Sequence, residues 1–158
     1  MSIKIISAVS NNYCIGKNND LVIRNSEDLK LFKKTTIGSN VVMGRKTWES
    51  LGEKPLPNRY NIVLTNKPDQ YKSSGEAFFC DFEFFKKFSD KNLDYFIIGG
   101  AEIYEKFLQE NLVDSIILSK FAEEVEGDTF FPKQYLENFK LKIINHCKGF
   151  KQNVYERN

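Results

Sequence analysis

Five short apolar runs, each of strand length and almost uninterrupted, constrain the fold of this chain more than any other feature. They are IKIISAV (3–9), NVVMG (40–44), YNIVLT (60–65), DYFIIGG (94–100) and DSIILSKF (114–121). Continuous apolar runs of this length are typical of strands buried on both faces. Helical patterns fall between them, over 26–38, 45–51, 80–88 and 101–110. The alternation predicts an α/β domain with a largely parallel central sheet.

The last part of the chain, NFKLKIINHCKGFKQNVYERN (138–158), reads as two strands around Lys148-Gly149. It therefore predicts an antiparallel hairpin at the edge of the sheet. The chain has 158 residues and shows no internal repeat, low-complexity tract or linker. This length suits a single substantial core, so we expect one domain over residues 1–158.

Charge and rare residue types exclude several classes of protein. The net charge is +2 and the basic residues are spread out, so neither a nucleic acid nor a membrane is predicted as a partner. No signal peptide is evident, and no segment approaches the roughly 20 apolar residues of a membrane span. Cys14, Cys80 and Cys147 are far apart, which argues against disulfides or a metal site and favours a reducing cytoplasm. With His146 as the only histidine, and no G-x-S-x-G, P-loop or G-x-G-x-x-G motif, hydrolase, P-loop and Rossmann functions are disfavoured.

The segment LVIRNSEDLKLF (21–32) places a carboxylate near an apolar helical face. Ser26 is the predicted N-cap, Leu29 and Phe32 have the three-residue spacing of such a face, and Asp28 points to nearly the same side. One explanation is that an acid in the first turn complements the helix dipole. The other is that Asp28 faces a pocket and holds a ligand that is cationic or donates hydrogen bonds. The local sequence favours the first explanation.

The residues that follow the strands are candidates for a site, because ligands in open α/β sheets bind beyond the carboxyl ends of the strands. At the start of one predicted helix, Gly44 permits close approach, while Arg45, Lys46 and Thr47 add two cations and a hydroxyl. The cations oppose the helix dipole there, which favours a bound anion such as phosphate over a solvated basic turn.

Two further junctions carry weaker signals of the same kind. FIIGGAEIYEKF (96–107) has two glycines at a strand end, which either form a tight turn or leave room for a diphosphate at a helix N-terminus. LTNK (64–67) ends another strand with polar groups suited to a ribose phosphate. Together with the basic junction, they favour an anion of dinucleotide size.

Two other motifs leave alternatives open. In PLPNRYN (55–61), prolines stiffen the approach to Arg59, whose guanidinium either forks onto a ligand carboxylate or lies on the surface of a turn. VEGDTFFP (125–132) is expected to be a loop, since Gly127-Asp128 favours a turn and Asp128 and Thr129 can bond nearby backbone. It could also pin a neighbouring loop, although the local pattern favours the simpler explanation.

Taken in order, these motifs resemble the dihydrofolate reductase family. VMGRKTWESLG, PLPNRYNIVL, IIGGAEIYEKFL and VEGDTFFP follow one another close to that family's spacing, and the resemblance extends over about residues 3–132. It implies a single α/β domain with an eight-stranded, mostly parallel sheet, an antiparallel C-terminal edge and four flanking helices. It also implies reduction of dihydrofolate to tetrahydrofolate with NADPH, by hydride transfer to C6 and protonation of N5, in support of one-carbon metabolism.

The resemblance also assigns residues to the substrate. Asp28 matches the family's pocket carboxylate, which pairs with the pteridine N3 and 2-amino group and holds the tautomer while water protonates N5. We expect its partly apolar setting to raise its pKa. Arg59 matches the arginine that binds the glutamate-tail carboxylate, and Ser119 replaces a threonine bonded to the pocket carboxylate. The walls around the rings are implied to be Ile6, Leu29, Phe32 and Leu51.

On the cofactor side, the resemblance implies that Ala8 and Ile15 meet the nicotinamide through backbone groups. Gly99 and Gly100 match a pair whose peptide bond is cis in this family. No metal is implied. The implied cofactor residues are Ala8, Ile15, Gly16, Leu21, Gly44, Arg45, Lys46, Thr47, Leu64, Thr65, Asn66, Ile98, Gly99, Gly100, Ala101, Glu102, Ile103 and Tyr104.

The chain departs from the family just before Asp28. After GKNNDL (16–21) the family continues with Pro-Trp, but here Val22-Ile23 follow. The tryptophan N–H usually joins a water-bridged contact near the pterin, and the proline stiffens the loop over the nicotinamide. Ile23 has no donor and Val22 leaves φ free. We therefore expect weaker substrate orientation, altered loop closure and reduced affinity for inhibitors that depend on the bridging water.

Two other functions stay open on the sequence alone. One is the reductase of related fold in the flavin pathway, which acts on a ribosyl-phosphate pyrimidine; Asp28, Arg59 and the TWESLG run argue against it. The other is a folate- or nucleotide-binding protein that has lost efficient catalysis, to which the missing Pro-Trp lends weight. The leading expectation is a cytoplasmic, monomeric enzyme whose ligands are dihydrofolate, antifolates and NADPH.

Overall fold

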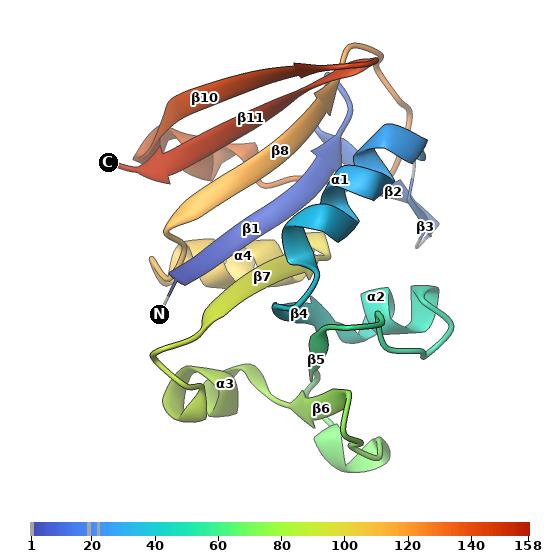
Figure 1. The fold of residues 1–158 in the computed structure, drawn as a ribbon, viewed down its shortest axis with the longest axis vertical. Helices are drawn as coiled ribbons and strands as arrows, with labels where there is room; N and C mark the ends of the chain where they lie inside the picture. The colour runs from blue at the N-terminus through green and yellow to red at the C-terminus, as the bar shows by residue number, and fades with distance from the viewer. Residues whose placement is uncertain (1, 19, 22) are drawn as a thin grey trace.

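An eight-stranded sheet forms the centre of the computed structural model, which describes residues 2–18, 20–21 and 23–158. Its strand order is β10-β11-β8-β1-β7-β4-β5-β6 (Figure 1). The strands are β1 (Ser2–Val9), β4 (Asn40–Gly44), β5 (Tyr60–Leu64), β6 (Ala77–Cys80), β7 (Asp94–Gly99), β8 (Ser115–Phe121), β10 (Phe139–Cys147) and β11 (Phe150–Arg157). β11 pairs antiparallel with β8 and β10, and the other neighbours are parallel. The predicted sheet and its antiparallel C-terminal hairpin are confirmed.

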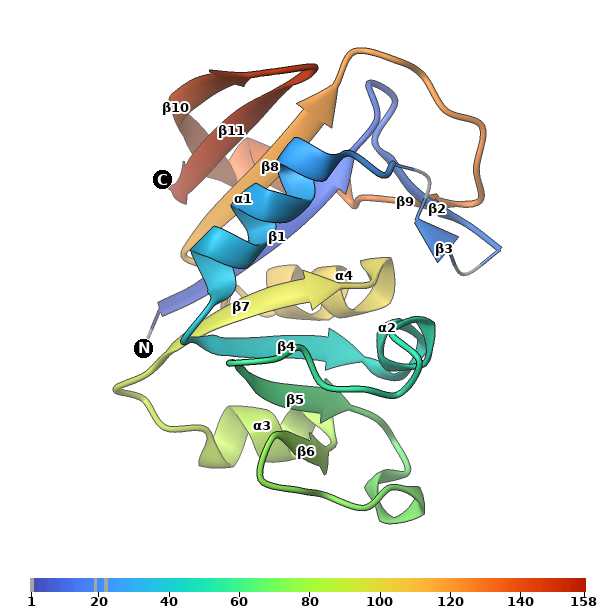
Figure 2. The ribbon, with the colours of Figure 1, turned by 45° about the vertical axis from the view of Figure 1, so that its right-hand side comes forward.

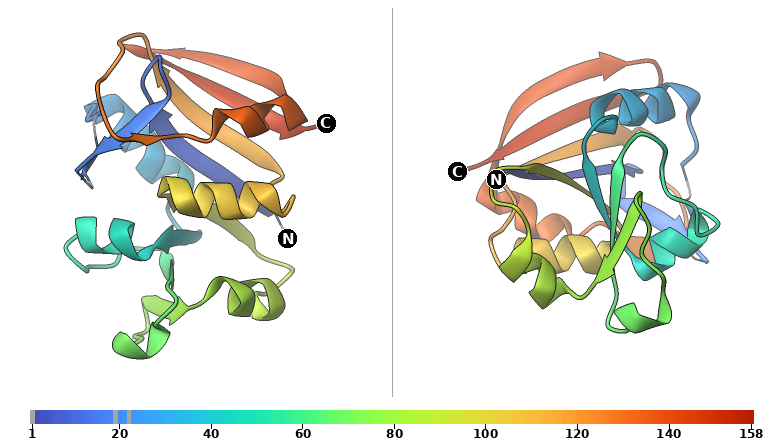
Figure 3. Two further views of the ribbon diagram at one scale, coloured as in Figure 1. Left: turned by 180° about the vertical axis from the view of Figure 1, so that it is seen from behind. Right: turned by 60° about the horizontal axis from the view of Figure 1, so that its bottom comes forward.

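Helices cover both faces of this sheet, which explains why its strands read as continuous apolar runs. The described part of the chain contains four α-helices, as the resemblance implies: α1 (Ser26–Thr36), α2 (Arg45–Ser50), α3 (Phe82–Phe88) and α4 (Ala101–Gln109). α1 lies in front of the sheet in Figure 1 and α4 lies behind it, as the view from the back in Figure 3 also shows. Neighbouring residues of a strand point to opposite faces of the sheet. Ile5 and Val42 pack with residues of α3 and α4, whereas Ile6 and Val41 pack with Trp48 of α2.

Short elements complete the connections between the strands and helices. Within the described residues there are two 3-10 helices: η1 (Pro68–Gln70) follows β5, and η2 (Lys133–Asn138) precedes β10. No helix in the described ranges is both long and apolar enough to cross a membrane.

Two predicted helix starts are wrong by one or two residues. α1 is capped by Asn25 instead of Ser26, because the Asn25 Oδ1 accepts a hydrogen bond from the Asp28 N–H at 3.0 Å. Asn and Ser are equally good caps, so composition could not separate them. Cys80 ends strand β6, and α3 begins after Asp81, whose carboxylate accepts from the Phe84 N–H at 2.7 Å. A four-residue apolar strand that leads directly into an aromatic helix leaves no break in hydrophobicity to detect.

A second, three-stranded sheet was not predicted. It contains β2 (Cys14–Lys17), β3 (Asp20–Leu21) and β9 (Thr129–Phe130), in the order β3-β2-β9 (Figure 2). Asp128, just before β9, accepts a hydrogen bond from the Asn18 N–H at 2.9 Å, and this bond is the first cause of the lowered pKa of Asp128. The 125–132 segment is thus partly a strand, and it does hold a neighbouring segment, against the simpler local explanation.

The first prediction concerns Gly127, which packs directly against β2. A β-carbon at this position would lie 2.3 Å from the Cys14 Sγ and 2.6 Å from the Gly16 carbonyl oxygen. Gly127→Ala should therefore lower the free energy of unfolding by about 1–3 kcal/mol, because backbone must shift to relieve the overlap. Gly75→Ala is the matched control, since a β-carbon there meets nothing within 4 Å. Urea denaturation measures both variants, and equal stabilities would contradict the packing of β2 on this segment.

Candidate functional site

A cleft of about 920 Å³ opens where β1, β4, β5 and β7 end. All of the residues predicted for the substrate side line it, and so do all of those predicted for the cofactor side except Leu21. The side chain of Leu21 and the whole of Val22 lie outside the described residues. The junctions that are dispersed along the sequence are therefore brought to one cavity by the parallel sheet.

Asp28 sits at one end of this cleft, in the first turn of α1. The Ser119 hydroxyl, from β8, donates a hydrogen bond to its carboxylate. Ser119 itself is only 5% exposed, so this contact is largely shielded from water. Burial raises the pKa of Asp28 above the ordinary value for aspartate, and the Ser119 hydrogen bond opposes this rise. A carboxylate that is desolvated in this way does more than complement the helix dipole, so the geometry supports the pocket explanation.

An apolar wall extends from Asp28 along the cleft. Ile6 of β1 is buried, and Phe32 and Leu51 pack beside it in the core that lies beneath α1 and α2. Leu29 is 53% exposed and lines the cleft, which makes apolar surface available there. Ile23, from the segment that departs from the Pro-Trp pattern, lines the same cavity. This end can accept a flat aromatic ligand with polar groups directed at Asp28.

Arg59 is held firmly in the wall and is not a surface residue of a turn. Its Nε donates to the Pro57 carbonyl oxygen and its Nη1 donates to the Thr36 Oγ1, both at 3.0 Å. The guanidinium carbon lies 5.9 Å from the centre of the Phe32 ring, and the residue is 8% exposed. Within residues 2–18, 20–21 and 23–158, no carboxylate pairs with Arg59. A buried, oriented guanidinium with unused donors is suited to a ligand carboxylate.

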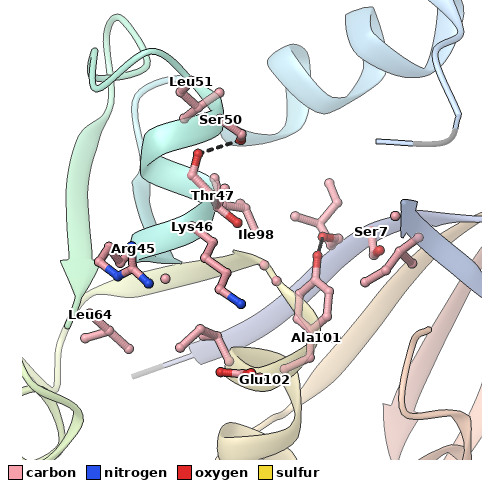
Figure 4. A pocket seen from close by; sticks show the side chains of 18 of the residues that line it. Ser7, Arg45, Lys46, Thr47, Ser50, Leu51, Leu64, Ile98, Ala101 and Glu102 are labelled. Carbon is pink, nitrogen blue, oxygen red and sulfur yellow. Dashed lines mark hydrogen bonds between the residues drawn. The ribbon is translucent and has the colours of Figure 1, made fainter. Parts of the chain in front are cut away.

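The other end of the cleft lies between the starts of α2 and α4. A β-carbon on Gly44 would lie 2.8 Å from the Ile103 Cγ1, so glycine is what allows α4 to approach the end of β4 this closely. Figure 4 shows Lys46 extending from α2 toward the start of α4, where Ala101 and Glu102 lie. The Arg45 Nη1 donates to both carboxylate oxygens of Glu49, at 2.8 and 2.9 Å. Two helix N-termini therefore face one cavity, which favours an anionic ligand.

The backbone between these two ends is held by Tyr104. Its hydroxyl donates to the Ile6 carbonyl oxygen at 2.9 Å and also bonds Ser7, and burial raises the pKa of this phenol. The hydrogen bond ties α4 to β1 at the middle of the cleft. The Gly99–Gly100 peptide beside it is cis, as the resemblance implies.

Comparisons with known proteins agree with this arrangement. The sequence model of the family described as dihydrofolate reductase matches residues 2–157. The chain belongs to the dihydrofolate reductase family. It is 34% identical to the dihydrofolate reductase of Haemophilus influenzae over 99% of the chain and 94% of that protein. It is 39% identical to that of Bacillus subtilis over 98% of the chain and 89% of that protein.

The fold matches a solved dihydrofolate reductase as well. The structure of the Enterococcus faecalis enzyme, complexed with NADP(H) and RAB-propyl, has a TM-score of 0.86 and 30% sequence identity, with 99% of this chain and 96% of that chain covered. The similarity therefore includes the β10–β11 hairpin, where the resemblance in sequence had weakened.

Several residues of this dihydrofolate reductase cleft were not predicted from the sequence. They are Ser7, Leu31, Lys33, Ser50, Leu56, Gln70, Tyr71, Phe82, Lys106, Thr129 and Gln152. Lys33 could have been found, because it follows Leu29 by four residues and so shares its helical face. Gln152 could not, since only the pairing of β11 with β8 places it opposite Ser119.

The second prediction is that Asp28 titrates above the ordinary range for aspartate, while Asp128 titrates below it. Burial disfavours the charged form of Asp28, whereas the Asn18 N–H stabilises the charged form of Asp128. Ser119→Ala should raise the pKa of Asp28 further, because it removes a donor to the carboxylate. Carboxyl-carbon NMR across a pH series measures all three values. An Asp28 that titrates at or below the ordinary value would contradict the desolvated setting.

Proposed function

We propose that this protein reduces 7,8-dihydrofolate to 5,6,7,8-tetrahydrofolate with NADPH. The observation that carries the proposal is the half-buried Asp28 carboxylate at one end of a cleft whose other end presents two helix N-termini. Membership of the dihydrofolate reductase family supports it. The NADP(H) bound to the similar Enterococcus faecalis enzyme supports the choice of cofactor.

On the substrate side, Asp28 pairs with the N3 and 2-amino group of the pteridine through a two-point, charge-assisted contact. Ser119 orients the carboxylate, and Ile6, Leu29, Phe32 and Leu51 enclose the rings. Arg59 binds the carboxylate of the glutamate tail, because it lines the cleft, and no acid among the described residues pairs with its remaining donors.

On the cofactor side, the residues present suit a dinucleotide. Gly44, Lys46 and Thr47 at the start of α2 and Gly100 and Ala101 at the start of α4 receive the diphosphate, while Thr65 and Asn66 contact the ribose phosphate. Ala8, Ile15 and Gly16 line the cleft beside the pteridine position and contact the nicotinamide. When bound, NADPH supplies a hydride for C6 of the substrate.

The chain's own contribution to the chemistry is orientation and electrostatics. Asp28 lies at the N3 side of the ring, so it does not reach N5; water delivers that proton. The carboxylate fixes the pteridine tautomer and increases the basicity of the ring by the negative charge that it holds nearby.

We also propose that the protein works as a monomer in the cytoplasm. One copy of the chain already supplies both the substrate side and the cofactor side of the cleft, which supports this part of the proposal. Cys14, Cys80 and Cys147 are free thiols, and this fits a reducing compartment.

The third prediction tests the proposed reaction by following NADPH oxidation in the presence of dihydrofolate. Asp28→Asn should lower kcat/KM about 10- to 100-fold, because a charge-assisted contact to the pteridine is lost. The affinity for NADPH should stay unchanged, since Asp28 lies at the other end of the cleft. Asp69→Asn, the same change on exposed η1, is the control. Tight binding of folate without turnover by the unaltered protein would indicate a binding protein in place of an enzyme.

The fourth prediction concerns Val22 and Ile23. Replacing both with the family's pair, Val22→Pro with Ile23→Trp, should increase the affinity for pteridine-like inhibitors and lower the KM for dihydrofolate. The physical reason is that the indole N–H adds a donor at the cleft and the proline stiffens the preceding segment. Inhibitor titration and steady-state kinetics measure both effects, with Ile23→Leu as a control for apolar bulk. Unchanged binding and kinetics in the double variant would reject this role.

A further inference from the structure

Glu102 is out of place in a cleft end that is proposed to receive a diphosphate. It is the second residue of α4, it is exposed, and it lines the cleft. Asp28 and Glu102 are the two acidic residues among the described residues that line the cavity, and Asp28 belongs to the substrate end. Glu102 therefore brings negative charge to the position at which a negatively charged ligand has to bind.

Glu102 offsets part of the positive side-chain charge around this position. Arg45 is bound to both carboxylate oxygens of Glu49, so that its charge is already paired within α2. Lys46 supplies one further positive charge, which points toward the start of α4 (Figure 4). Glu102 offsets that charge. Attraction for an anion then comes from the backbone N–H groups of the helix starts and from Lys67 and Lys106, which also line the cleft.

Nothing else in the described part of the chain neutralises Glu102. No cation there lies within ion-pair distance of its carboxylate. Lys106, one turn further along α4, has its ammonium 5.8 Å from the centre of the Phe82 ring. The negative charge of Glu102 therefore acts on whatever occupies the start of α4.

A purely structural role for Glu102 is the alternative, since acids in a first turn stabilise a helix. α4 is anchored independently of it, by the buried Tyr104, Phe107 and Leu108 and by the Tyr104 hydrogen bond to Ile6. The two roles predict different changes in cofactor affinity when the charge of Glu102 is removed. If Glu102 only stabilised the helix, removing its charge would leave cofactor affinity unchanged or weaken it, because the binding surface would be less well ordered.

We propose that Glu102 is an affinity-lowering residue of the cofactor site, whose carboxylate repels the diphosphate and so speeds the release of NADP(H). This rests on the proposed function, because it needs the diphosphate to lie at the start of α4. In the free protein the carboxylate lies in the region of positive potential created by the start of α4 and by Lys46. When the cofactor is bound, its diphosphate lies in the same region and the two negative charges repel each other.

The test measures binding of NADPH and of NADP⁺ by quenching of Trp48, the single tryptophan of the chain, without any substrate. Glu102→Gln should bind both forms about five- to tenfold more tightly at low salt, mainly through slower dissociation in stopped-flow experiments. In about 1 M salt, where the Debye length is about 3 Å, most of this gain should disappear. Glu102→Asp, which keeps the charge, should bind like the unaltered protein.

Glu105→Gln is the matched control, because it removes the same charge from the same helix at a residue that does not line the cleft. It should leave both dissociation constants unchanged. Equal or weaker binding by Glu102→Gln would overturn the proposal. Absence of NADPH binding by the unaltered protein would instead overturn the proposed function, so that the two failures are distinguishable.

Discussion

Burial of the central strands on both faces is the constraint on which the rest of this structure depends. β1, β7, β4 and β5 run parallel, so each connection has to cross back over the sheet, and helices make those crossings. These four strands then end at one edge of the sheet, and α2 and α4 begin there. The cleft, its helix N-termini and the convergence of residues from distant parts of the chain all follow from this single arrangement.

The two ends of the cleft use different electrostatics. At one end a single carboxylate, Asp28, is partly withdrawn from water and contacts one hydroxyl, which suits a directed contact with a planar heterocycle. At the other end, ion pairing within α2 and the charge of Glu102 reduce the positive charge that the side chains offer to an anion, and the backbone dipoles of two helix starts add to what remains. A site of this kind selects its substrate by geometry at the first end and controls the residence of its cofactor at the second.

Much of this fold could be predicted from the sequence, because the information is local. The runs at 40–44 and 94–100 became β4 and β7 with little change, since a strand buried on both faces must be apolar at every position. The β2–β9 pairing could not be predicted, because these strands are only four and two residues long and lie far apart in the chain. The predicted starts of α1 and α3 were wrong for a related reason. Asn25 and Ser26 are equally good caps, and apolar residues continue from β6, which ends at Cys80, into α3.

For the site, the sequence by itself determined which residue types were available and at which junctions: the cations after β4, the glycines after β7, and an acid in the first turn of α1. Motif order then indicated the family. Only the tertiary structure decided that Asp28 faces Ser119 and that Arg59 is buried on Thr36. It also decided that, among the described residues, Arg45 is paired while Glu102 is not. The local sequence shows which chemical group a side chain carries. Its burial and its charged neighbours depend on segments that are distant in sequence, so they could not be predicted from it.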